Sequence, residues 1–187
     1  LVTPASKGIT EDIPETGTTL RANSLQKAQY IFDHTSGADC FADDTGLEVD
    51  ILGGAPGVYS ARYAGPDKSF SANIDKLLDE MARKEYEASV AREYDIATPK
   101  ATRRARFKTV ITLILNGQKL FFEGAMEGRI SYERVGNGGF GYDPVFIADD
   151  YPDVTVAELT DDQKNAISHR GKALRSMAQW LQEYSTK

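Results

Sequence analysis

The sequence predicts an α/β protein in which a mixed, twisted sheet is flanked by helices. Three observations support this class. Apolar residues recur at helical spacing in three segments, short β-branched and aromatic segments lie between them, and an Asn-Gly pair in the middle of the chain is a strong hairpin signal. Early helices and strands alternate, which is typical of a sheet with helices packed against it. The 187 residues suffice for a core, and we expect one domain over residues 1–187.

A first helix is predicted over residues 19–34. Thr18 or Thr19 can cap its N-terminus, and Gly37 can end it. Its apolar residues recur every three or four positions, at Ala22, Leu25, Ala28 and Phe32.

The next segment is expected to be extended. Residues 38–42 are predicted to form a short strand, residues 43–46 a turn and residues 47–49 a second extended piece. A break rich in Gly follows at residues 53–57. The prediction here is two strands around an acidic turn.

Ser69 is predicted to open a second helix. Its apolar face consists of Phe70, Ile74, Leu77, Leu78 and Met81. Residues 83–103 carry many charges and little periodicity, so they either extend this helix or form a mobile excursion.

The second half of the chain is predicted to contain a hairpin and two helices. A β-branched run around residues 107–114 leads into the turn at Asn116-Gly117, and a further strand is expected at residues 125–134. Thr160 with Gln163 forms a capping-box pattern, and a terminal helix is predicted from Ser168 onward.

Composition excludes several classes of protein. The chain has 22 Lys and Arg against 28 Asp and Glu, a net charge of −6, which argues against binding duplex nucleic acid through a broad basic face. Cys40 is the single cysteine, so no intrachain disulfide can form and a reducing cytoplasmic location is expected. The longest apolar run, residues 110–115, is far shorter than the roughly 20 residues of a membrane-spanning helix, so we expect no membrane insertion.

Residues 136–141 contain a formal G-x-G-x-x-G pattern. A dinucleotide-binding loop must open a helix, whereas residues 142–146 are expected to be extended and include Pro144. The segment is therefore either a turn between strands or a loop that lets a flat ligand approach its backbone, with Phe140 available for stacking. A Walker motif is absent from the sequence.

Two groups of charged residues could perform chemistry. Asp43 and Asp44 offer carboxylate oxygens for Mg²⁺ and a base for water, with Glu15 as a possible further ligand; the plain alternative is a solvated acidic turn. Lys164, His169 and Arg170 offer donors to phosphate or to a planar acceptor, and the plain alternative is a solvated helix face. Together with the Gly-aromatic loop, they match three tasks: holding Mg²⁺, seating a base and neutralising phosphate.

Four blocks of the sequence resemble the signatures of the inosine/xanthosine triphosphate pyrophosphatase (ITPase) family, in the same order. They are FADDTGL at residues 41–47, GGAPGVYSARYAG at residues 53–65, GFGYDP at residues 139–144 and KNAISHR at residues 164–170. The resemblance implies an ITPase-like fold and a homodimeric, Mg²⁺-dependent enzyme. Its substrates would be non-standard purine triphosphates such as ITP, dITP and XTP, hydrolysed to the monophosphate and pyrophosphate to cleanse the nucleotide pool.

The same resemblance implies roles for individual residues. Asp44 would be the proton acceptor and a metal ligand, supported by Asp43, while Glu15 would be a further metal ligand. The remaining matched residues would bind substrate, at Thr45, Lys27, Phe140, Gly141, Tyr142, Asp143, Lys164, His169 and Arg170.

Base recognition has a physical rationale. Hypoxanthine and xanthine present an acceptor oxygen at position 6, where adenine presents an amino donor. A buried donor such as Arg170 would favour the keto base and oppose adenine. Guanine is also a 6-keto base, so its exclusion does not follow from this argument.

The sequence also departs from the family pattern. Nothing before Glu15 matches the family's first strand and Thr/Ser-x-Asn-x-x-Lys phosphate loop, so we expect this chain to lack both. Ala22 stands where many members carry Glu. The absent phosphate loop leaves a nucleotide-binding module with impaired catalysis as one alternative. A Maf-type nucleotide pyrophosphatase is the alternative among enzymes.

Overall fold

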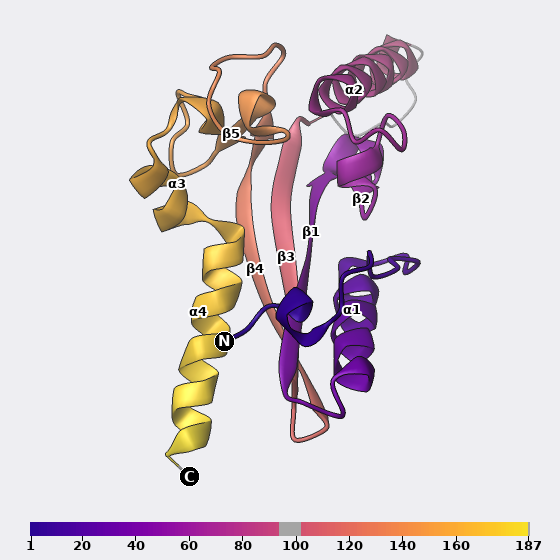
Figure 1. Ribbon diagram of the computed structural model, residues 1–187. Helices are drawn as coiled ribbons and strands as arrows, with labels where there is room; N and C mark the ends of the chain where they lie inside the picture. Colours follow the sequence, from indigo (N-terminus) through magenta and orange to yellow (C-terminus); the bar gives the residue numbers. More distant parts are fainter. Residues whose placement is uncertain (94–101, 187) are drawn as a thin grey trace. The chain divides into compact units, whose positions relative to one another are not determined.

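The computed structural model describes residues 1–93 and 102–186 (Figure 1). In these residues, five strands form one sheet in the order β2-β1-β3-β4-β5. The strands are β1 (Cys40–Val49), β2 (Pro56–Gly57), β3 (Arg104–Leu115), β4 (Gln118–Ile130) and β5 (Phe146–Ala148), and the α-helices are α1 (Leu20–His34), α2 (Phe70–Glu93), α3 (Asp161–Ile167) and α4 (His169–Ser185). The predicted α/β class, with helices flanking a sheet, is confirmed.

The chain packs as two compact units. The first consists of Leu1–Thr45, Thr109–Ala125 and His169–Lys187, and the second of Gly46–Lys108 and Met126–Ser168. The core of the first unit is built around Ile111, Leu113, Phe122, Ala173 and Met177. The core of the second is larger and includes Leu47, Leu77, Met81, Ile130, Val145 and Phe146.

The first helix forms as predicted. The Thr19 side chain caps α1 by accepting a hydrogen bond from the Ala22 amide at 3.1 Å, so Thr19 rather than Thr18 is the cap. At the other end, Gly37 adopts a positive φ of 78°, and its amide donates to the Phe32 carbonyl at 3.0 Å. This left-handed residue ends the helix, as expected from its sequence position.

The expected acidic turn at residues 43–46 is wrong, because β1 runs without interruption from Cys40 to Val49. Asp and Gly favour turns in isolation, but each side chain here finds a partner on a neighbouring element. The Thr45 hydroxyl, for example, lies 2.7 Å from that of Thr109 in β3. The two predicted strands are therefore one strand, and the two aspartates lie inside it.

The second helix begins after Ser69, as predicted, and the Ser69 hydroxyl accepts from the Ala72 amide at 3.3 Å. It continues to Glu93, so helix extension is the correct interpretation for residues 83–93. The prediction for the charged segment also covered residues 94–101, which lie outside the described residues.

The Asn116-Gly117 hairpin is confirmed. Both residues have positive φ, 50° and 75°, as a tight two-residue turn between twisted strands requires. A separate strand at residues 125–134 is wrong, because β4 continues from Gln118 to Ile130 with no turn signal inside it. The capping box of Thr160 and Gln163 forms at the start of α3, and α4 follows from His169. No helix in the described residues is long and apolar enough to cross a bilayer.

Gly124 in β4 provides a test of how closely α4 approaches the sheet. A Cβ atom at this position would lie 2.6 Å from the backbone nitrogen of Ala173. We expect Gly124→Ala to lower the free energy of unfolding by about 3 kcal/mol or more, because backbone must move aside. In the control Gly117→Ala, the added Cβ meets nothing within 4 Å, and only the positive φ costs about 1 kcal/mol. Equal losses in urea titrations of the two variants would contradict this packing.

Candidate functional site

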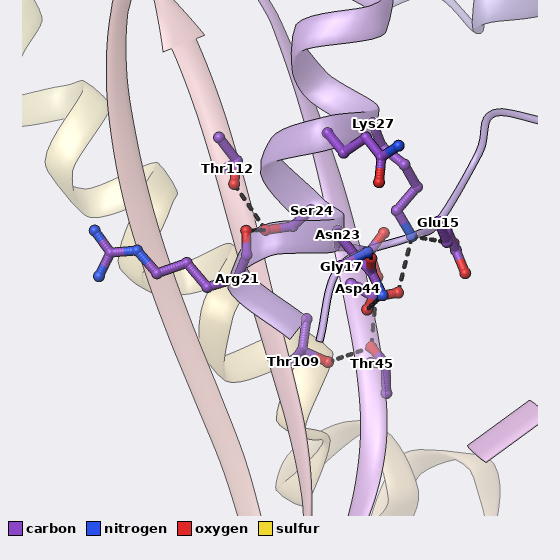
Figure 2. A network of polar contacts seen from close by, with 12 residues as sticks. Glu15, Gly17, Arg21, Asn23, Ser24, Lys27, Asp44, Thr45, Thr109 and Thr112 are labelled. Carbon is purple, nitrogen blue, oxygen red and sulfur yellow. Dashed lines mark hydrogen bonds and ion pairs between the residues drawn. The ribbon is translucent and has the colours of Figure 1, made fainter. Parts of the chain in front are cut away.

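A buried carboxylate on β1 lies at the centre of a polar network in the first unit (Figure 2). The Lys27 ammonium donates to Asp44 Oδ1 at 2.9 Å and to Glu15 Oε1 at 2.7 Å. Asn23 Nδ2 donates to the other oxygen of Asp44, Oδ2, at 3.2 Å. The structure therefore brings together three predicted site residues, Glu15, Lys27 and Asp44, and adds Asn23.

Helix α1 positions the two donors. Asn23 and Lys27 are separated by one helical turn, so both side chains project from the same face toward β1. The segment before the helix supplies Glu15 and then Gly17, whose amide donates to Asn23 Oδ1 at 2.8 Å. One helix face thus holds a strand carboxylate and a loop carboxylate next to each other.

Burial and ion pairing shift the pKa values of this centre. Burial raises the pKa of Asp44 above its ordinary value, and hydrogen bonds from Lys27 and Asn23 offset part of this effect. For Lys27, desolvation alone lowers the pKa, but the hydrogen bonds and charges of Glu15 and Asp44 together outweigh it, and the net pKa is raised. Lys27 therefore stays charged, while Asp44 is a stronger base than an exposed aspartate.

The donor set at this centre suits a hard divalent cation. In residues 1–93 and 102–186, no group of three or more His, Cys, Asp or Glu side chains could hold a metal by itself. Asp44 and Glu15 do supply two carboxylates, and Mg²⁺ is commonly bound by one or two carboxylates together with substrate phosphates and water. The pair therefore fits a Mg²⁺ ion that arrives with a phosphorylated ligand.

Asp43 faces the opposite side of the sheet from Asp44, because successive side chains in a strand alternate. Its Oδ2 atom accepts from Arg170 Nε at 3.1 Å and from Arg170 Nη2 at 3.0 Å, which links β1 to the start of α4. The Arg170 side chain is 57% exposed, so the expectation of a buried donor at this position is wrong. Thr45 lies on this same face and contacts Thr109. The adjacent aspartates thus have separate partners, on α1 for Asp44 and on α4 for Asp43.

His169 is largely enclosed at the start of α4. Desolvation is the largest of the effects that together lower its pKa from 6.5 to about 4; the charges of Arg170 and Lys172 act in the same direction, and Asp43 opposes them. The imidazole is therefore neutral at physiological pH.

The remaining predicted residues belong to the second unit. Phe140 is 73% exposed and packs its ring edge-on against Phe70, with centroids 4.7 Å apart. Asp143 Oδ2 accepts from the Phe140 amide at 2.9 Å and lies 3.9 Å from Lys164 Nζ. Burial raises the pKa of Asp143 despite these donors. Lys164 thus pairs with Asp143, whereas His169 and Arg170 belong to the first unit.

Residues 136–141, the Gly-rich segment, are not followed by an α-helix, so the prediction that this is not a dinucleotide-binding loop is confirmed. Residues 142–146 are only partly extended, because Asp143–Val145 form a 3-10 turn before β5 begins at Phe146. Tyr142 is buried, and its hydroxyl donates to the Ser60 carbonyl at 2.9 Å. Gly141, at φ 59°, supplies the left-handed residue that makes this turn possible.

Sequence reasoning missed Asn23, Gly17 and Thr109. None of the three carries a charge, and none lies within the four sequence blocks that resemble the ITPase family. One signal was present: Asn23 lies one helical turn before Lys27, so the two share a face. The contact of Thr109 with Thr45 joins positions 64 residues apart, and no local pattern predicts it.

Comparison with known proteins identifies the family. Residues 2–180 match the model of the Ham1 family. A dITP/XTP pyrophosphatase of Christiangramia forsetii is 47% identical over 171 residues, which cover 91% of this chain and 80% of that protein. A dITP/XTP pyrophosphatase of Bacillus subtilis is 43% identical over 179 residues, covering 95% of this chain and 82% of that protein.

Solved structures agree with the sequence relatives. A HAM1 protein from Coxiella burnetii superposes with a TM-score of 0.83 at 36% identity, over 96% of this chain and 84% of that one. The Staphylococcus aureus Ham1 protein gives a TM-score of 0.79, also at 36% identity, over 94% and 82% of the two chains. The family resemblance inferred from the four sequence blocks is confirmed, and this chain belongs to the Ham1 family.

Proposed function

We propose that this protein hydrolyses non-standard purine nucleoside triphosphates, dITP, XTP and ITP, to the monophosphate and pyrophosphate, and so cleanses the nucleotide pool. The observation that carries the proposal is the buried Asp44 carboxylate, held between Lys27 and Asn23 and paired through Lys27 with Glu15. The relatives support the same proposal, because proteins 42–47% identical to this chain are named dITP/XTP pyrophosphatases.

Asp44 is the proposed general base. Each of its oxygens accepts one hydrogen bond in the structure, so each keeps a lone pair for a water molecule. In the proposed step, water oxygen attacks the α-phosphorus, its proton passes to Asp44, and the bond to the bridging oxygen breaks to release pyrophosphate. Lys27 places a permanent positive charge beside the base, where negative charge develops on the phosphate.

Magnesium is the proposed cofactor. Asp44 and Glu15 are the residues that would hold it. When bound, the ion would neutralise phosphate charge and increase the acidity of water. Lys27 lies between the same two carboxylates and keeps their charges compensated before nucleotide arrives.

The predicted substrate-binding residues keep their roles in this proposal. Phe140 offers an exposed aromatic face for stacking, and Lys164 a cation; Thr45, Gly141, Tyr142 and Asp143 keep their predicted roles as substrate contacts. The neutral imidazole of His169 and the guanidinium of Arg170 offer N–H donors to a 6-keto oxygen, which adenine lacks. A donor that faces the amino donor of adenine would disfavour ATP.

The remaining proposals concern the setting of the enzyme. We propose a homodimer in the cytoplasm, on the basis of the family resemblance and the single cysteine. The net charge of −6 supports free nucleotides, rather than nucleic acid, as the partners.

A substrate panel tests the function directly. We expect Mg²⁺-dependent release of pyrophosphate from dITP, XTP and ITP, much slower release from ATP, and loss of activity in EDTA. Pyrophosphate is measured with a coupled assay, and the monophosphate by chromatography. Turnover mainly of modified pyrimidine nucleotides would favour the Maf-type alternative, and ITP binding without turnover would favour the nucleotide-binding module.

The role of Asp44 is tested by Asp44→Asn. Removal of the base should lower kcat on dITP by about 10²- to 10⁴-fold, because the amide keeps the shape but cannot take a proton. Asp149→Asn is the matched control: this exposed carboxylate pairs with Arg104 at 2.7 Å, and its loss should leave kcat unchanged. Near-normal turnover in Asp44→Asn would refute the assignment.

The neutral state of His169 predicts a pH dependence of stability. In the unfolded chain the imidazole titrates near 6.5, and in the folded chain near 4, so the unfolded state binds the proton first. The free energy of unfolding should therefore decrease as the pH falls from 6.5 to 4. Denaturant titrations should show the wild type losing about 3 kcal/mol more than His169→Gln over this range. Parallel pH profiles for the two proteins would contradict the enclosed, neutral imidazole.

A further inference from the structure

We propose that Asn23 is a positioning residue that holds the Asp44 carboxylate and the Glu15–Gly17 segment in the geometry needed for hydrolysis. This inference rests on the proposed function of Asp44 as the base. Asn23 contributes no charge and reaches the reaction only through its neighbours, so it is not itself a catalytic residue.

Both ends of the Asn23 amide are used. The residue is completely buried, Nδ2 donates to Asp44 Oδ2 at 3.2 Å, and Oδ1 accepts from the Gly17 amide at 2.8 Å. A flipped amide would place its oxygen against the carboxylate and its NH₂ against an N–H group. The two partners therefore permit one orientation, and the side chain cannot turn without losing both hydrogen bonds.

Gly17 adds an independent observation. A Cβ atom at this position would lie 2.7 Å from both Asn23 Oδ1 and Ala22 Cβ, so the loop backbone approaches the helix as closely as only glycine allows. Glu15 lies two residues before this contact, and Lys27 binds it from the next turn of α1. Asn23 thus fixes the backbone that carries one carboxylate while holding the side chain of the other.

A neutral donor suits this task. Lys27 already supplies one positive charge to Asp44 and Glu15. The Asn23 amide adds a second hydrogen bond to Asp44 without adding a second charge, so it restrains the carboxylate while Lys27 remains the compensating cation. The expected consequence of losing Asn23 is therefore misplacement of Asp44, with Lys27 still present.

Ser24 is a closely matched control. It is the next residue of α1, it is also completely buried, and its hydroxyl lies 2.7 Å from that of Thr112 in β3. Ser24→Ala therefore removes a buried hydrogen bond between the same helix and the sheet, without touching Asp44 or Gly17. A purely structural role of Asn23 predicts that Asn23→Ala and Ser24→Ala behave alike.

The experiment compares wild type, Asn23→Ala, Asn23→Asp and Ser24→Ala. We expect kcat on dITP to fall about tenfold to a hundredfold in both Asn23 variants, with KM changed less than about threefold, since a small displacement of a reacting group has an effect of this size. Ser24→Ala should keep the wild-type kcat. Melting temperatures should fall by similar amounts in Asn23→Ala and Ser24→Ala.

Exchange of the Gly17 amide, followed by NMR, gives a readout that needs no activity. Wild type and Asn23→Asp keep an acceptor for this N–H group and should protect it; Asn23→Ala should not. Equal kcat in Asn23→Ala and Ser24→Ala, or unchanged Gly17 exchange in Asn23→Ala, would overturn the proposal. An inactive wild type would instead refute the proposed function, so the two failures are distinguishable.

Discussion

The buried negative charge of Asp44 is the constraint on which the site depends. An ionised carboxylate away from water is costly unless charge and hydrogen bonds compensate it. Lys27 supplies the charge and Asn23 the second hydrogen bond, and both come from one face of α1. The position of α1 against β1 is therefore tied to the chemistry of the strand. Removing Lys27 would leave the Asp44 charge buried without its ionic partner, which is strongly destabilising in proteins.

Because side chains alternate along β1, the two neighbouring aspartates lie on opposite faces of the sheet and have different partners. Asp44 faces α1, where burial raises its pKa, and Asp43 faces α4, where Arg170 binds it from two nitrogen atoms. Two adjacent carboxylates on one face would have repelled each other. The pleat of the strand avoids this repulsion and gives each aspartate its own helix. Two adjacent residues of one strand thus bind two different cations, Lys27 on one face of the sheet and Arg170 on the other.

Local signals in the sequence predicted the elements whose ends are set by local chemistry. The cap at Thr19, the turn at Asn116-Gly117 and the capping box at Thr160 all depend on residues within four positions of each other. The continuous strand through Asp43 and Asp44 could not be predicted this way, because long-range partners override the turn preference of these residues. Asn23 was missed for the same reason: its partners, Gly17 and Asp44, become neighbours only after folding.

The conflict between local preference and observed structure at residues 43–46 is itself informative. Asp and Gly are poor strand formers, and a sequence selected only for stability would place β-branched residues there. Natural proteins break such local rules mainly where function requires it. The neighbouring strand accommodates the exception with Thr109, which is buried and satisfies the Thr45 hydroxyl. The acidic stretch of β1 therefore persists because α1, β3 and α4 each supply a polar partner, and it marks the site more specifically than the charges of Asp43 and Asp44 do alone.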